Sequence, residues 1–264
     1  MNLNGKVSLF ETDFNGTKMS FEVGKMGLLT DGAVVVRYND SVVLATAVIS
    51  KKVKEGQDFF PLSVEFQDKW YATGKISGSR FIKREGRPSE LAILRSRMID
   101  RPIRPMFPKG YLNEVQIIVS PLSLDYTIDP VVLGLNAASA ALMLTGAPFE
   151  GPIAAVRVGR IDDQFIVNPT NEQENLSDLD LLVAGTAEAI TMIEGGASQV
   201  VEEEITKALE LAQKSIQPSI ELQKKMAAEL QIEAREYTLQ LPDEELYQEV
   251  ASFLAGKLGE SIRS

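Results

Sequence analysis

Segments with the residue pattern of β-strands lie on both sides of a single apolar segment that predicts a helix. This order restricts the chain to a fold that combines strands and helices. Residues 33–38 and 41–49 are rich in β-branched side chains and are separated by Asn39-Asp40, a two-residue hairpin signal. An Ala- and Leu-rich stretch, residues 130–145, predicts a helix that ends at Gly146. Further strands are expected at 59–66, 115–120, 153–158, 165–168, 180–185 and 189–193. This order predicts an α+β core of roughly 200 residues.

The last third of the chain is expected to be helical. Val201, Ile205, Leu209 and Ala212 recur at helical spacing, and Pro218 is expected to break or kink the helix that they form. A second helix start follows at residues 242–246, where a proline and three acids precede a leucine.

This pattern divides the chain into three parts. Residues 1–145 and 146–235 are expected to form the first and the C-terminal part of one core. Residues 236–264 are expected to be the incomplete beginning of an all-helical segment, because the predicted helix is followed by no closing element.

The composition excludes several kinds of chemistry. The 264 residues contain no cysteine and no histidine, which excludes disulfides, thiolate zinc sites and Ser-His or Cys-His catalysis. Any reaction would depend on carboxylates, lysine, tyrosine or a hard cation such as Mg²⁺. No apolar run approaches the ~20 residues that cross a bilayer, and residues 1–20 show no apolar block of a signal peptide. We therefore expect a cytoplasmic protein without a membrane partner.

Positive charge is concentrated in residues 69–110. This segment holds eleven of the 27 lysines and arginines but only three acids, a local net charge of +8 in a chain of net charge −10. Such a basic stripe suits a polyanion, for example single-stranded nucleic acid. The alternative is that these arginines form internal ion pairs with the acidic remainder of the chain. Trp70 and Tyr71 also have two interpretations, since they would either stack on RNA or belong to the core or an interface.

A helix is expected to begin within the basic segment at Ser89. The serine can cap the first free amide groups, and the spacing of Leu91, Leu94 and Met98 predicts a stripe that faces the core. Pro102 is expected to end the helix, because a proline disfavours helical geometry in the residue before it.

Several long motifs resemble the polynucleotide phosphorylase (polyribonucleotide nucleotidyltransferase) family of the ribonuclease PH superfamily. They read FFPLSVEFQDKWYATGKI, KREGRPSE, MIDRPIRPMFP, NAASAALMLTGAPFEGPIAAVRVG and LDLLVAGTAEAITMIEG, in that order along the chain. The resemblance covers nearly all of residues 1–235. It implies a ribonuclease PH-like core of mixed sheets packed with helices, followed by the start of a helical domain.

The resemblance also implies an activity for the full-length parent enzyme. Members of the family degrade single-stranded RNA from its 3′ end by phosphorolysis, using inorganic phosphate and Mg²⁺ and releasing nucleoside diphosphates. Three chains form a ring with a central RNA channel, and degradosome proteins are possible further partners in mRNA turnover. This chain would be the first core, which gives ring architecture and RNA guidance. The resemblance implies no bound cofactor in this part of the enzyme.

In the family the active site belongs chiefly to the second core. The serines that bind phosphate there correspond here to Asp129 and Pro130, and the acid pair and lysine correspond to Glu174, Asp180 and Leu182. A carboxylate repels phosphate, proline has no donor, and leucine cannot replace a lysine. The resemblance therefore implies no catalytic residue and no metal ligand in this chain, although the carboxylates of Glu174 and Asp180 leave an ion possible.

The RNA channel supplies the candidate binding residues. The Phe-Phe-Arg-Arg loop of the family corresponds to residues 81–84, where Phe81, Lys83 and Arg84 keep the aromatic and cationic character and isoleucine replaces the second aromatic. The predicted RNA-binding residues are Phe81, Lys83, Arg84, Arg87, Arg101 and Arg104. Arg101 and Arg104 would equally brace a trimer interface. Two other possibilities stay open: a purely structural ring-forming core, or a phosphorylase that is active with a catalytic partner chain.

Overall fold

Two β-sheets and the helices between and beside them form the protein, whose computed structural model describes residues 6–76, 86–255 and 257–263. The strands of this described part are β1 (Ser8–Phe14), β2 (Thr17–Val23), β3 (Gly32–Tyr38), β4 (Ser41–Ile49), β5 (Leu62–Phe66), β6 (Val115–Ser123), β7 (Ala154–Ile161), β8 (Gln164–Val167), β9 (Leu179–Gly185) and β10 (Ile190–Ala197). The helices are η1 (Trp70–Thr73), α1 (Glu90–Ile103), η2 (Arg104–Met106), α2 (Pro130–Met143), α3 (Asn171–Glu174), α4 (Glu202–Ser215), α5 (Gln217–Glu229), α6 (Glu244–Leu254) and α7 (Lys257–Arg263).

The first sheet has the strand order β1-β2-β3-β4-β6-β5. Its central hairpin joins β3 to β4 with Tyr38 opposite Ser41, and Asn39 has a φ of 50°, the left-handed conformation that such a tight turn requires. The predicted hairpin is therefore confirmed. β5 is parallel to β6, and the chain between these two strands contains α1, which packs against β5.

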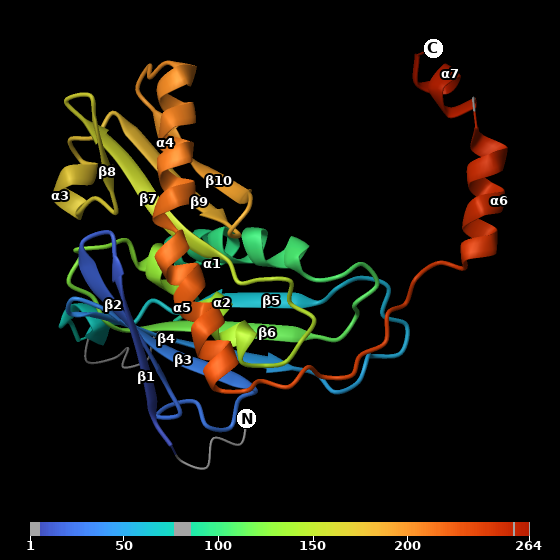
Figure 1. The fold of residues 1–264 in the computed structure, drawn as a ribbon, viewed down its shortest axis with the longest axis horizontal. Coiled ribbons are helices and arrows are strands. Elements are labelled where there is room, and N and C mark those ends of the chain that lie inside the picture. Colours follow the sequence, from blue (N-terminus) through green and yellow to red (C-terminus); the bar gives the residue numbers. More distant parts are fainter. Residues whose placement is uncertain (1–5, 77–85, 256, 264) are drawn as a thin grey trace.

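The second sheet has the order β10-β9-β7-β8 and is antiparallel throughout. Figure 1 shows it above the first sheet, with α4 packed beside it and α1 between the two sheets. The segments that predict β structure after residue 150 all fall on these strands, so the expected α+β class is confirmed.

α2 is the central helix of the fold. Every residue from Pro130 to Leu142 is buried, and the helix packs against β3, β4 and β6 of the first sheet and β7 of the second. A helix that is apolar on all sides has to be covered on all sides, so α2 lies between layers rather than on the surface. The predicted helix at 130–145 is thus confirmed.

A buried polar network connects α2 to its neighbours. Asn136 Nδ2 donates to the carbonyl oxygens of Val132 (2.8 Å) and Ala155 (3.0 Å), the latter on β7. Its Oδ1 accepts from Ser219 Oγ on α5 (2.6 Å), and Gln223 Nε2 donates to the same hydroxyl (3.4 Å). Since a buried polar group without a partner destabilises a fold, these bonds fix the relative position of α2, β7 and α5.

Helix α1 differs from its prediction in two ways. Leu91 and Leu94 are about half exposed, at 52% and 51%, so the expected core-facing stripe is wrong at these two positions, whereas Met98 is partly buried and packs against the core. The buried face instead contains Ala92 and Ile99, with Ser96 between them donating to Ala92 O (2.9 Å) and accepting from the amide of Phe66 on β5 (2.8 Å).

The predicted end of α1 at Pro102 is also wrong, because the helix continues to Ile103. Pro102 lies in the last turn, where its missing N–H removes a single intrahelical bond. The amide of Arg104 still bonds to Asp100 O, and η2 extends the turn to Met106.

The boundaries of the C-terminal helices agree with the predictions from the sequence. α4 ends at Ser215, and α5 begins with Pro218 in its first turn, as the proline predicted. Residues 231–241 then return along the first part of the core, where Arg235 forms an ion pair with Asp31 (2.5 Å). Asp243 caps α6 by accepting from the amide of Leu246 (3.0 Å), so the predicted helix start is confirmed.

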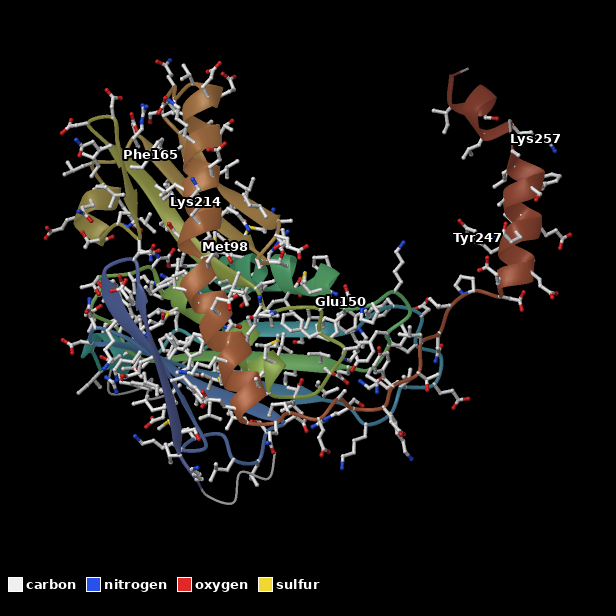
Figure 2. All side chains as sticks on the ribbon, in the orientation of Figure 1. Met98, Glu150, Phe165, Lys214, Tyr247 and Lys257 are labelled. Atoms are coloured by element: carbon white, nitrogen blue, oxygen red, sulfur yellow. The ribbon has the colours of Figure 1, made fainter. Side chains whose placement is uncertain are left out.

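α6 and α7 stand away from the two sheets. Figure 1 shows them on an extended connection, and Figure 2 shows Tyr247 of α6 and Lys257 of α7 far from the side chains of the core. No residue of α6 is buried. The division at residues 145 and 235 stays a prediction. None of the helices in the described ranges has the length and apolar character needed to cross a membrane.

The network around Asn136 yields a stability prediction. Asn136→Ala leaves the Ala155 carbonyl and the Ser219 hydroxyl without their buried partner, so the free energy of unfolding should fall by about 2 to 3 kcal/mol. Urea denaturation followed by circular dichroism measures this change. Asn175→Ala is the matched control, because the exposed Asn175 makes a single bond to Asn171 O (2.8 Å). Equal effects of the two substitutions would contradict the role given to the network.

Candidate functional site

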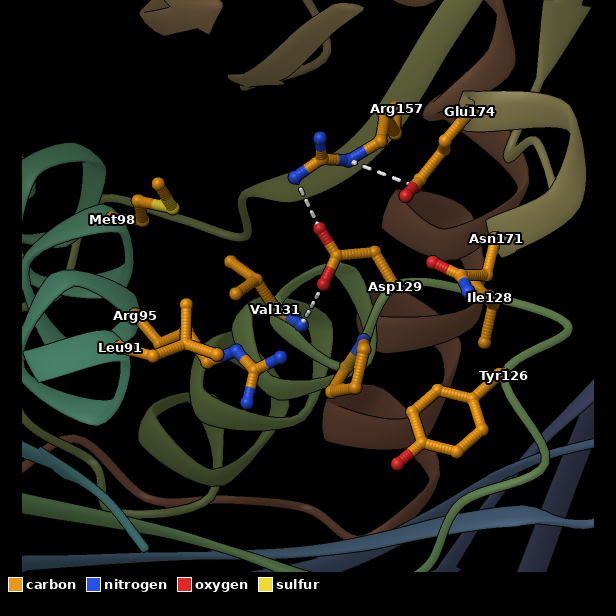
Figure 3. Close-up of a pocket in the computed structure, with 11 residues that line it drawn as sticks. Leu91, Arg95, Met98, Tyr126, Ile128, Asp129, Val131, Arg157, Asn171 and Glu174 are labelled. Atoms are coloured by element: carbon orange, nitrogen blue, oxygen red, sulfur yellow. Dashed lines mark hydrogen bonds and ion pairs between the residues drawn. The ribbon is translucent and has the colours of Figure 1, made fainter. Parts of the chain in front are cut away.

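Three carboxylates converge on one largely buried arginine beside the N-terminus of α2, and Figure 3 shows two of them, Asp129 and Glu174. Arg157, whose side chain is 15% exposed, contacts Asp129 and lies 2.5 Å from Asp180 and 3.6 Å from Glu174. The resemblance assigns all three of these acids to positions that correspond to the active site of the second core. The structure brings them together, and it adds an arginine that sequence reasoning missed.

Each member of this Arg157 cluster is placed by a different element. Asp129 caps α2 and accepts from the amide of Val131 (2.9 Å). Glu174 ends the short helix α3, Asp180 lies on β9, and Arg157 lies on β7.

The register of the second sheet adds a further relation. Arg157 is paired with Leu182 across β7 and β9, so the arginine lies beside the position at which the family carries a lysine. The signal that could have identified it is a charged residue within the apolar run 154–158, between the buried Val156 and Val158.

The charges of the cluster affect one another strongly. Burial alone would lower the pKa of Arg157, but Asp129, Asp180 and Glu174 outweigh it and raise that pKa, so the guanidinium stays charged. Burial raises the pKa of Glu174 above its ordinary value; the attraction of Arg157 opposes this, and the two other carboxylates add to it. Glu174 is therefore the acid whose charge is least well compensated.

This arrangement fits neither a phosphate ion nor Mg²⁺. The Asp129 carboxylate occupies the α2 amide and a guanidinium nitrogen, the donors that an anion would need, and its own charge repels phosphate. Arg157 places a positive charge at the centre of the three acids, where a cation would otherwise bind. Within the described ranges no group of three or more acidic residues is placed to hold a metal ion.

The cluster lines the first of two hollows that have lining residues in common. One, of about 200 Å³, extends from Arg157 and Glu174 to Tyr126, as Figure 3 shows. The other, of about 420 Å³, lies against η1 and β6. The two share the lining residues Leu91, Arg95 and Tyr126.

The predicted RNA-binding residues are placed only in part. Phe81, Lys83 and Arg84 lie outside the described residues. Arg87 is exposed in the connection that precedes α1, where it lines a third hollow of about 390 Å³ together with Trp70.

The two arginines at the end of the basic segment make internal contacts. Arg101 pairs with Glu194 on β10. Arg104 pairs with Asp100 (2.7 Å) and donates to the carbonyl oxygens of Phe60 (3.2 Å) and Leu62 (3.1 Å). These bonds hold α1 and η2 against the neighbouring elements, and contact of either arginine with RNA stays a prediction.

Comparison with known proteins gives two adjoining domain matches. The model for domain 1 of the 3′ exoribonuclease family matches residues 17–148, and that for domain 2 matches residues 151–215. Polyribonucleotide nucleotidyltransferase from Thermus thermophilus is 55% identical over 221 residues, which cover 84% of this chain and 31% of that protein. Polyribonucleotide nucleotidyltransferase 1 from Alkaliphilus metalliredigens is 45% identical over 258 residues, which cover 98% of this chain and 37% of that protein. The chain thus spans about a third of the length of these relatives.

A solved structure shares the fold. The crystal structure of rice (Oryza sativa) Rrp46 superimposes with a TM-score of 0.63 at 13% sequence identity, covering 82% of this chain and 98% of that one. At this identity the likeness concerns the fold alone. With the two domain matches, it confirms the ribonuclease PH-like fold expected from the sequence.

The raised pKa of Glu174 yields a pH-dependent prediction. A carboxyl with a raised pKa binds its proton more readily in the folded protein, so its contribution to stability falls as pH rises through that pKa. Glu174→Gln removes this penalty and should stabilise the protein at pH 7, by up to about 1 kcal/mol. Below the ordinary value of 4.5 the advantage should vanish. Urea denaturation over this pH range measures the difference.

Asp129→Asn is the contrasting variant. It weakens the contact with Arg157 and the cap of α2, so it should destabilise the protein at pH 7 by about 1.5 to 3 kcal/mol. Destabilisation of similar size by both substitutions would show that Glu174 is as well compensated as Asp129, contrary to this account of the cluster.

Proposed function

The chain belongs to the 3′ exoribonuclease family, and from this membership we propose that it forms the N-terminal part of a polyribonucleotide nucleotidyltransferase. The full-length enzyme would be a cytoplasmic ring of three chains that degrades RNA 3′→5′ by phosphorolysis, with inorganic phosphate and Mg²⁺ as requirements. Degradosome proteins would be further partners. The part represented by this chain would guide RNA and build the ring, while the bond-breaking chemistry takes place in the other core.

The Arg157 cluster is the observation that supports assigning RNA guidance to this core and the bond-breaking chemistry to the other. The positions that correspond to a phosphate and metal site hold Asp129, Glu174 and Asp180 bonded to an internal arginine. A site whose anion donors and carboxylates are satisfied by each other has no free group for the attacking phosphate. This supports a core without catalytic residues.

RNA guidance is supported by the basic segment. Its +8 charge contrasts with the acidic remainder of the chain, and electrostatic capture of a polyanion requires such a local excess. Because Arg101 and Arg104 are engaged internally, the guidance would depend chiefly on Phe81, Lys83 and Arg84, with Arg87 beside them.

A second candidate function is a purely structural core that makes no RNA contact of its own. The internal ion pairs of Arg95, Arg101 and Arg104 favour it, since each of these charges already holds two elements together. The two functions predict different responses to salt. Phosphate neutralisation gives a salt-dependent affinity, whereas the structural core would not bind RNA at all.

Titration of a fluorescent oligo(A) with the chain at several salt concentrations tests RNA guidance. We expect salt-sensitive binding, and the double variant Lys83→Ala/Arg84→Ala should bind more weakly because it loses two cations. The slope of log affinity against log salt should become shallower by about 1.4, which is two contacts at roughly 0.7 each for a single strand.

The matched control is Lys51→Ala/Lys52→Ala, which removes two exposed lysines outside the basic segment. It should leave the slope unchanged. Guidance by the loop is refuted if both double variants change the slope equally, or if the chain fails to bind oligo(A) at low salt while its mass shows an assembled ring.

Phosphorolysis by the chain itself is a separate test. Incubated with poly(A), inorganic phosphate and Mg²⁺, the chain should release no ADP, because the donors beside α2 are occupied by Asp129. Chromatography of the nucleotides measures the product. Release of ADP by the chain would instead support an independently active core.

A further inference from the structure

Residues 231–241, the strap, connect α5 of the core to α6. Figure 1 shows the strap as an extended segment that runs along the core and then leads to the two C-terminal helices. All residues from Glu236 to Leu241 are exposed, and α6 itself has no buried residue. Burial of apolar side chains therefore does little to hold the strap on the core, and its attachment depends on a few specific contacts.

The first attachment is at Arg235. Its amide donates to the carbonyl oxygen of Gly146 (2.7 Å), just after α2, and its guanidinium pairs with Asp31 (2.5 Å). The other Asp31 oxygen accepts from the amide of Ile49 at the end of β4 (2.8 Å), which orients the carboxylate toward the arginine. The side chains of Arg235 and Asp31 are 35% and 22% exposed, so dissolved salt can screen this ion pair.

The second attachment lies further along the strap, at Gln240. Its amide donates to the carbonyl oxygen of Gly110 (2.9 Å), and the neighbouring Leu239 forms a β-bridge with Tyr111. Between the two attachments, the rings of Tyr237 and Tyr111 meet edge to face with their centres 5.9 Å apart. Tyr111 is only 2% exposed, so the strap contributes to the cover of a buried ring.

Two glycines of the core let the backbone of the strap approach closely. Gly146 and Gly110 have φ values of 71° and 80°. A Cβ atom at Gly146 would lie 2.2 Å from the carbonyl oxygen of Glu233, and one at Gly110 would lie 2.7 Å from that of Gln240. Any side chain at these two positions would collide with the strap, so the core surface is shaped to receive it.

The strap therefore combines a well-defined seat with weak attachment. Segments with few buried apolar contacts and exposed backbone hydrogen bonds open locally at a lower free energy than the core. The two attachments also support each other, because each one keeps the other close to its partner and raises its effective concentration. Loss of the ion pair between Asp31 and Arg235 should consequently loosen the attachment at Gln240 as well.

We propose that the strap detaches from the core as one unit, that the Asp31–Arg235 ion pair keeps it attached, and that its detachment frees α6 and α7 to move relative to the core. While the strap is attached, the contact at Gln240 holds the chain shortly before α6 begins at Glu244. Salt favours detachment, because it screens a partly exposed ion pair. This device goes beyond the proposed function, since neither RNA contact nor catalysis enters the argument.

Hydrogen exchange of single amides, followed by NMR, tests whether the strap detaches as one unit. Arg235→Gln removes the ion pair and leaves the bond from the Ile49 amide to Asp31 in place. The amides at positions 235 and 240 should then both exchange faster, by about 5-fold, as expected for a partly exposed ion pair. The amides of α2 should keep their rates, because the core stays folded.

Arg160→Gln is the matched control, since it removes an arginine of β7 that pairs with Asp178 (2.6 Å) and should leave both strap amides unchanged. Higher salt should speed exchange of the two strap amides in the unchanged chain but not in Arg235→Gln. Faster exchange at position 235 alone, or no change at either position, would overturn the proposal. Equal acceleration in α2 would also overturn it, because the whole core would then be opening.

Gly110→Ala tests the coupling from the other attachment. Its Cβ would collide with Gln240, so the amide at the distant position 235 should exchange faster. Gly56→Ala is the matched control, because Gly56 has nearly the same φ of 78° but a Cβ there meets no atom within 4 Å. Equal effects of the two substitutions would assign the change to backbone strain and contradict coupling between the attachments.

The movement of α6 can be measured separately, because the chain contains no cysteine. Spin labels at Glu210→Cys on α4 and Glu249→Cys on α6, two exposed positions, report the distance between the core and α6 by pulsed EPR. Arg235→Gln should broaden the distribution of this distance, whereas Arg160→Gln should not. Identical distributions in the unchanged chain and in both variants would overturn the proposal that the strap governs the position of α6.

Discussion

The burial of α2 is the constraint on which the rest of the structure depends. A helix without a polar face is stable only when it is enclosed, so the two sheets and α5 have to meet around it. Asn136 fixes how they meet, because its amide is satisfied only when β7 and α5 lie in one relative position. The same packing brings the N-terminus of α2 beside β7, β9 and α3. Asp129 therefore reaches Arg157, and the geometry of the cluster follows from the packing of an apolar helix.

Ion pairs gather at two places in this protein, the Arg157 cluster and the basic segment. Acids outnumber the cation at the first, and cations outnumber the acids at the second. Around Arg157, one cation binds three acids and leaves Glu174 incompletely compensated. Along the basic segment, Arg95, Arg101 and Arg104 each find an acid on the molecule itself. Part of the positive charge is therefore architectural, since it connects α1 to its neighbours. Asp100 is already counted in the net charge of +8, and the pairs with Asp68 and Glu194 offset two more charges, so these three pairs still leave an excess of +6.

Features with a local cause could be predicted from the sequence, and features that depend on long-range contacts could not. The hairpin at Asn39 and the helix start at Asp243 follow from turn and cap chemistry within a few residues. The buried face of α1 was missed because Ser96 reads as polar, although its hydroxyl is satisfied by β5. Pro102 predicts the end of α1, yet it lies late enough in the helix to be tolerated. Arg157 was missed because its three partners lie on separate elements.

The position of Trp70 is difficult to explain by folding energetics alone. A tryptophan buries roughly 150–250 Å² when it enters a core, and at about 25 cal/mol per Å² leaving half of that area exposed forgoes about 2–3 kcal/mol. The chain places the small Ala72 inward and Trp70 outward from the same turn, although an inward aromatic would contribute more to stability. The 54% exposure of Trp70 therefore argues against a place in the core, and of the interpretations given above it agrees with stacking on RNA or with a place in an interface.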